Sequence, residues 1–165
     1  AVEAAYEAMR VRCMATAADA ERQPKLQSLE QVMAPLAPYT PAAVHAEARR
    51  AVADEARLSL YGGADALPER QPPRHLAIQI NHGLQELLCK YPQSLLFGED
   101  VAQKGGVYTL TRDLLRRFGP RRVFNTLLDE TMILGMAQGL ANMGMLPIPE
   151  IQYLAYLHNA IDQIR

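Results

Sequence analysis

From His75 onward, the chain alternates short apolar segments with longer amphipathic ones, and short connections join them. Strands and helices that alternate in this way form βαβ units, whose strands are parallel and are covered by helices. We therefore expect an α/β domain with a mostly parallel sheet flanked by helices. The expected strands are 94–97, 122–125 and 146–151, and the expected helices are 76–90, 110–118, 130–144 and 153–165.

An α-helical extension or connector is expected before this domain, in residues 1–58. Pro35 and Pro38 should interrupt it, and Pro41 can open a second helix, 41–58, with Thr40 as its N-cap. The first part carries apolar side chains at intervals near 3.6 residues, which gives one apolar face. These side chains belong to Val2, Ala5, Tyr6, Met9, Cys13 and Ala17.

A linker is expected at residues 59–74, because glycine and proline pairs concentrate there, at Gly62-Gly63 and Pro72-Pro73. The α/β domain then occupies 75–165 and is incomplete at its C-terminus. The chain starts and stops inside helical patterns, which favours a piece of a longer polypeptide.

Charge and composition exclude several classes of function. The net charge of −1 argues against a nucleic-acid partner. No apolar run approaches the ~20 residues that cross a membrane. Cys13 and Cys89 lie far apart, which indicates buried or idle thiols in a reducing compartment. No histidine, cysteine and aspartate cluster has the spacing of metal ligands, so no metal-binding residue is expected in this segment.

Glu130 holds the position that most suggests a ligand site. It follows the strand 122–126 and the tight exit 127–129, and it opens an apolar helix that carries Gly135 and Gly139. In open α/β sheets, ligands bind at the carboxyl ends of strands. An ordinary first-turn acid that complements the helix dipole, worth about 0.3–1 kcal/mol, is the alternative for Glu130. The two glycines indicate a close contact, either within the domain or at a subunit interface.

A resemblance over residues 75–165 adds to this pattern. The segment resembles the β part of thiamine-diphosphate-dependent 2-oxo acid dehydrogenases, the decarboxylating E1 component. The spacing of Glu130, Gly135 and Gly139 also resembles the pyrimidine-binding half of that superfamily. The matching blocks, in order, are Phe97–Val101, Lys104–Tyr108, Phe118–Thr126, and Glu150–Gln152 followed by Asp162–Ile164.

The resemblance implies thiamine diphosphate as cofactor, with Mg²⁺ bound by parts outside this segment. It assigns Glu130 to the hydrogen bond with the pyrimidine N1′ that activates the cofactor, and it places Leu128, Gln152 and Tyr156 around the aminopyrimidine. The apolar neighbours of Glu130, Leu127 among them, should bury its carboxyl group. The family usually has proline at the position of Leu127 and a small residue at the position of Asp129.

The implied partners are a 2-oxo acid substrate, an α-type diphosphate-binding domain, further copies in a homo- or hetero-oligomer, and a lipoyl-bearing acyltransferase. The implied location is the bacterial cytoplasm or the mitochondrial matrix, and the segment alone should be inactive. Two alternatives stay open. One is another thiamine-diphosphate enzyme, of transketolase or deoxyxylulose-phosphate-synthase type. The other is a non-catalytic interaction module that keeps the fold and uses residues 1–58 as an adaptor.

Overall fold

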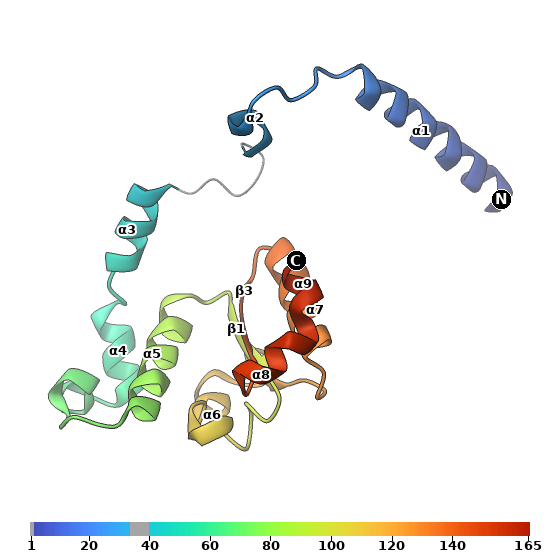
Figure 1. Ribbon diagram of the computed structural model, residues 1–165. Coiled ribbons are helices and arrows are strands. Elements are labelled where there is room, and N and C mark those ends of the chain that lie inside the picture. The colour runs from blue at the N-terminus through green and yellow to red at the C-terminus, as the bar shows by residue number, and fades with distance from the viewer. Residues whose placement is uncertain (1, 34–39) are drawn as a thin grey trace. The chain divides into compact units, whose positions relative to one another are not determined.

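The computed structural model describes residues 2–33 and 40–165, and Figure 1 shows its helices and strands. The chain divides into two compact units, Ala1–Arg50 and Ala51–Arg165, which are described one at a time. The helix breaks expected at Pro35 and Pro38 lie outside the described residues.

The first unit contains α1 (Val2–Arg22), α2 (Leu29–Met33) and α3 (Pro41–Arg49). Neither α1 nor α3 buries any residue. The apolar face predicted for α1 is solvent-exposed, and Tyr6, for example, is 69% exposed. Helices of this kind gain little from tertiary burial, which is the main source of helix stability in proteins.

The helix expected over 41–58 is wrong in its extent. It starts as predicted, with Thr40 as N-cap and Pro41 as the first residue, but it ends at Arg49. Arg50 and Ala53 have extended backbone, with ψ angles of 117° and 131°. A new helix, α4 (Asp54–Tyr61), follows, and its first-turn acids complement the helix dipole. No glycine or proline marks the break, so the sequence gives no local signal for it.

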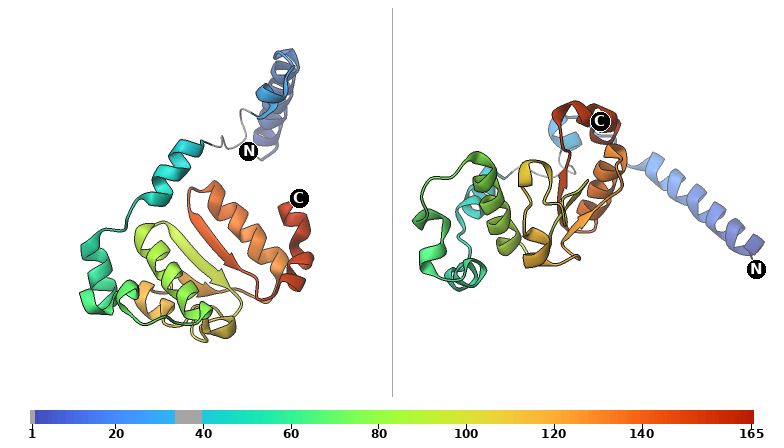
Figure 2. Two further views of the ribbon diagram at one scale, coloured as in Figure 1. Left: turned by 60° about the vertical axis from the view of Figure 1, so that its left-hand side comes forward. Right: turned by 90° about the horizontal axis from the view of Figure 1, so that it is seen from below.

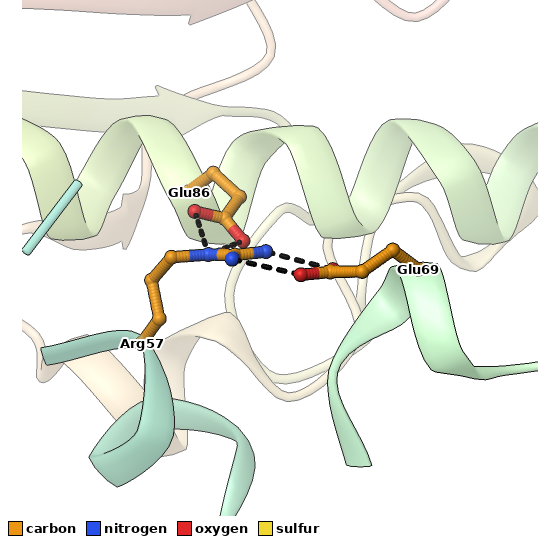
Figure 3. Close-up of polar contacts among 3 residues, drawn as sticks. All are labelled: Arg57, Glu69 and Glu86. Carbon is orange, nitrogen blue, oxygen red and sulfur yellow. Dashed lines mark hydrogen bonds and ion pairs between the residues drawn. The ribbon is translucent and has the colours of Figure 1, made fainter. Parts of the chain in front are cut away.

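The second unit begins upstream of the boundary expected near His75. It includes α4 and two 3₁₀ turns, η1 (Ala64–Ala66) and η2 (Pro68–Arg70), so most of 59–74 has regular structure. Arg57 of α4 forms ion pairs with Glu69, which lies within 59–74, and with Glu86, which lies in the helix that follows (Figure 3). Its Nε lies 2.9 Å from Glu86 Oε1, and its Nη2 lies 2.9 Å from Glu69 Oε2. The two carboxylates raise the pKa of Arg57, whose side chain is 22% exposed.

Replacement of Arg57 with glutamine should make residues 59–74 more mobile. Glu69 and Glu86 would both lose the cation with which they pair. We therefore expect trypsin to cut after Arg70 and Arg74 faster than in the unchanged chain. Limited proteolysis with mass spectrometry measures these rates. Arg116→Gln is the matched control, because the only ion pair of Arg116 among the described residues is an exposed contact of 3.5 Å with Asp113. Equal cleavage rates in both variants would show that the ion pairs of Arg57 do not stabilise residues 59–74.

The sheet confirms the predicted α/β class. It contains β1 (Ser94–Gly98), β2 (Val123–Asn125) and β3 (Leu146–Glu150), in the order β2-β1-β3, and both pairings are parallel. Leu96 in the central strand lies opposite Val123 on one side and Ile148 on the other. The central strand is therefore apolar along nearly its whole length, as strands covered on both faces are.

Helices cover both faces of the sheet (Figure 2). Because successive strand residues point to opposite faces, Leu96 and Phe97 enter different clusters. Leu96 packs with residues of α5 (Leu76–Lys90) and α6 (Leu114–Phe118). Phe97 packs with Ile133 and Ala137 of α7 (Glu130–Asn142), and its ring stacks on Phe124 at 5.3 Å between centroids.

Two expected helices are shorter or broken. The helix expected at 110–118 starts only at Leu114, because the backbone before it has positive φ at Tyr108, Thr109 and Asp113. Those three residues belong to or follow the 3₁₀ turn η3 (Val107–Thr109). The helix expected at 153–165 is divided into α8 (Leu154–Leu157), the 3₁₀ turn η4 (His158–Ala160) and α9 (Ile161–Ile164).

Within 2–33 and 40–165, no helix has both the length and the apolar character that a bilayer crossing requires.

Candidate functional site

A cavity of about 310 Å³ opens at the carboxyl ends of the strands, and it contains all the site residues expected from the sequence. Glu99 follows β1 and Gln152 follows β3, while Leu128 and Glu130 follow β2. The full lining consists of Glu99, Leu128, Glu130, Gln152, Tyr156 and Asn159. Three strand ends and the η4 turn thus contribute side chains to one place, the position at which open α/β sheets bind ligands.

Glu130 is the first residue of α7, and its neighbour Asp129 is the N-cap of that helix. Asp129 Oδ1 accepts a hydrogen bond from the backbone N–H of Met132 at 3.0 Å. The second acid is therefore committed to the helix end. Sequence reasoning missed this role, although aspartate immediately before an apolar helix is a standard capping signal.

Asn159 is a further site residue that sequence reasoning missed. Its Nδ2 donates a hydrogen bond to Glu130 Oε2 at 3.4 Å. The neighbour of Glu130 also binds this residue, because Thr131 Oγ1 donates to the carbonyl oxygen of Asn159 at 2.8 Å. Asn159 and Glu130 lie 29 residues apart in sequence, so only the fold brings them together.

The side chains at the mouth of the cavity are largely open to solvent. Leu128 is 70% exposed and Tyr156 is 45% exposed. The ring of Tyr156 packs edge-on against Tyr153, with 5.6 Å between centroids. The expected apolar cover for Glu130 is absent from this surface, since Leu127 is 73% exposed and Ile133 points into the core.

Gln152 contacts the cavity floor. Its Nε2 lies 3.5 Å from the carbonyl oxygen of Glu99, at the limit of a hydrogen bond. Its side-chain carbonyl oxygen has no hydrogen bond among the described residues and is available to a ligand. Sequence reasoning did not place Glu99 in the site, and the fold brings it into the cavity because β1 ends beside β3.

Glu150, the last residue of β3, supports the loop that follows β1. Burial raises the pKa of its carboxyl group, while a hydrogen bond from the backbone N–H of Val107 has the opposite effect. A Cβ on Gly106 would lie 3.3 Å from Glu150 Oε1, and one on Gly98 would lie 2.6 Å from its carbonyl oxygen. Glycine at both positions lets the loop and the strand approach Glu150, which agrees with a structural role for this acid.

A second cavity, of about 450 Å³, lies against α5 in the same unit. Its lining includes Tyr61, His82, Gln85 and Arg117, and no acidic residue of the described chain contributes to it. It therefore lacks the carboxylate that the expected chemistry needs. Among the described residues, no group of three or more histidine, cysteine, aspartate or glutamate side chains is placed to hold a metal ion.

Fold and site together define a class: a helix-covered parallel α/β domain with a carboxylate-lined cavity at the ends of its strands. The sequence family described as "Transketolase, pyrimidine binding domain" matches residues 76–165, which is more than half of the chain. The chain belongs to this family, as the blocks in its second half predicted.

Similar proteins are β subunits of 2-oxo acid dehydrogenases. The chain is 44% identical over 85 residues to the 3-methyl-2-oxobutanoate dehydrogenase subunit beta of Mycobacterium tuberculosis, covering 52% of this chain and 24% of that protein. It is 42% identical over 85 residues to the pyruvate dehydrogenase E1 component subunit beta of Staphylococcus epidermidis, covering 52% of this chain and 26% of that protein. The chain thus spans about a quarter of the length of these relatives.

Proposed function

We propose that the chain supplies the aminopyrimidine side of the cofactor site in a thiamine-diphosphate-dependent 2-oxo acid dehydrogenase. The observation that carries this proposal is the single cavity that holds Leu128, Glu130, Gln152 and Tyr156. The names of the relatives support the reaction class, since one is a 3-methyl-2-oxobutanoate dehydrogenase and the other a pyruvate dehydrogenase. Those names favour this reading over the transketolase-type alternative.

The side chains of the cavity suit an aminopyrimidine ring. A carboxylate can share a proton with a ring nitrogen, an amide can pair with an amino group, and an aromatic and an aliphatic side chain can pack against the ring. Glu130, Gln152, Tyr156 and Leu128 provide these groups in that order. When bound, thiamine diphosphate supplies the carbon nucleophile and electron sink for decarboxylation, as cofactors carry the difficult chemistry.

Glu130 has the role of general acid and base in this proposal. Its carboxyl group would hold and return the proton at the pyrimidine N1′, while Tyr156 and Leu128 orient the ring. A cavity closed by the ring excludes water, which strengthens hydrogen bonds at the carboxylate. The exposed apolar side chain of Leu128 then becomes buried, which favours binding.

The remaining parts of the site are proposed to lie in other domains. An α-type domain would bind the diphosphate and Mg²⁺, since none of the described residues forms a metal set. The second half of α7 is open to such a partner: a Cβ on Gly139 would meet no atom of the described residues within 4 Å, and Met143 is 79% exposed. Gly135, in contrast, faces Gln163 of α9 in the same unit. A homo- or hetero-oligomer and a lipoyl-bearing acyl acceptor complete the proposed assembly.

An assay of the holoenzyme that contains this chain tests the proposal. We expect release of carbon dioxide from pyruvate or a branched 2-oxo acid, dependent on added thiamine diphosphate and Mg²⁺. Ketol transfer between sugar phosphates would favour the transketolase-type alternative. Cofactor binding without turnover of either substrate class, or no cofactor binding, would favour the non-catalytic module.

A further inference from the structure

We propose that Asn159 is a positioning residue that fixes which oxygen of Glu130 faces the cofactor; this inference rests on the proposed function. The two residues meet at the edge of the strand-end cavity, where Asn159 Nδ2 donates to Glu130 Oε2 at 3.4 Å. The family resemblance assigns no role to Asn159.

The contact is built from both sides. Thr131, next to Glu130 on α7, donates its hydroxyl hydrogen to the Asn159 carbonyl oxygen at 2.8 Å. Ala160, the following residue, is fully buried and fixes the η4 backbone. The asparagine side chain therefore starts from an anchored backbone and reaches a carboxylate on the helix that anchors it.

The anchor lies where a helix expected to run through 153–165 is instead a 3₁₀ turn. In η4 (His158–Ala160), the Asn159 carbonyl accepts a hydrogen bond from Thr131. This bond connects η4 with the first turn of α7, beside Glu130.

The geometry divides the two carboxylate oxygens between two tasks. Asn159 Nδ2 is a donor only, so the oxygen that it reaches, Oε2, acts as an acceptor and carries no proton in this contact. Within 40–165, no hydrogen bond from another side chain reaches Oε1 of Glu130. Oε1 is then the oxygen that exchanges the proton with a bound ring, while Oε2 keeps the carboxyl group oriented.

A ligand-free experiment examines the contact itself. In the ¹H–¹⁵N spectrum of the chain, the side-chain NH₂ signals of Asn159 should shift in Glu130→Gln and stay in place in Glu99→Gln, whose carboxylate lines the same cavity but does not bond Asn159. Asn159 signals that are unchanged in Glu130→Gln would overturn the proposal.

A second experiment examines the consequence for the bound cofactor in the holoenzyme. Asn159→Asp keeps the shape of the side chain but removes the donor. We expect C2 hydrogen–deuterium exchange of bound thiamine diphosphate to slow by at least about tenfold, within the ~10²-fold range that a misplaced catalytic group can reach. The dissociation constant for the cofactor should change less than the exchange rate does.

Gln93→Glu is the matched control, because it makes the same change in charge at an exposed side chain just before β1, at the opposite end of the strand from the cavity. Asn159→Ser keeps a shorter donor and should recover part of the exchange rate. If Asn159→Asp exchanges at the normal rate while Glu130→Gln does not, the positioning role fails and the proposed function survives. If Glu130→Gln itself exchanges normally, the proposed function fails.

Discussion

In the holoenzyme, Glu130→Gln is expected to slow C2 hydrogen–deuterium exchange of bound thiamine diphosphate by about 10²–10⁴-fold, the usual contribution of a general acid or base. An amide has nearly the size and shape of the carboxyl group but cannot accept and return the proton at N1′. Cofactor affinity should fall much less, because the diphosphate is proposed to be held by another domain. Exchange followed by NMR after rapid quenching, with decarboxylation measured in parallel, provides the comparison.

Two carboxylates near Glu130 serve as controls. Glu99→Gln changes the other acid that lines the cavity, and Asp129→Asn changes the N-cap of α7. Both should exchange at nearly the normal rate, and asparagine remains a good N-cap. A larger exchange defect in either control than in Glu130→Gln would mean that the wrong acid has been assigned.

Phe97→Ala is expected to destabilise the chain by about 3–5 kcal/mol, the range for truncating a buried phenylalanine. Phe97 is fully buried in the central strand, and it stacks on Phe124 of β2 and packs against α7. Its removal leaves a cavity that a sheet fixed on two sides cannot easily close. Denaturation by urea, followed by far-ultraviolet circular dichroism, measures the change in the free energy of unfolding.

Tyr6→Ala provides the contrast for this measurement. Tyr6 is 69% exposed on α1, so its truncation should change the stability by no more than about 0.5 kcal/mol. A loss from Tyr6→Ala comparable to that from Phe97→Ala would show that the apolar face of α1 is buried in solution.

The regular elements of the α/β domain were predictable because burial controls them directly. Five- and three-residue strands with apolar side chains, and the helices α5 and α7, follow from hydrophobic period and length. The breaks at Arg50 and before Leu114 were not predictable in the same way. Positive φ at Tyr108 is uncommon for such a residue and accompanies the contact of the neighbouring Val107 N–H with Glu150, which local propensity does not predict.

The residues of the candidate site also differ in whether the sequence predicted them. Glu130 lies next to a strand end, so its place in a cavity followed from chain order and from the rule for open sheets. The family resemblance supplied Leu128, Gln152 and Tyr156. Asn159 and Glu99 enter the site only because segments far apart in the sequence are in contact there. Such contacts cannot be predicted from one sequence alone.

The two prolines of β3 limit backbone hydrogen bonding along the β3 edge of the three-stranded sheet. Ile148 lies opposite Leu96 of β1, and the N–H of Leu146 donates to the carbonyl oxygen of Gln93 just before β1. Because backbone groups alternate in direction along a strand, positions 147 and 149 face away from β1, and both are proline. A strand docking there would find carbonyl oxygens but no N–H donors at these two positions. This border is therefore poorly suited to sheet extension by a second molecule, which protects the chain from strand-mediated aggregation while its partners are absent.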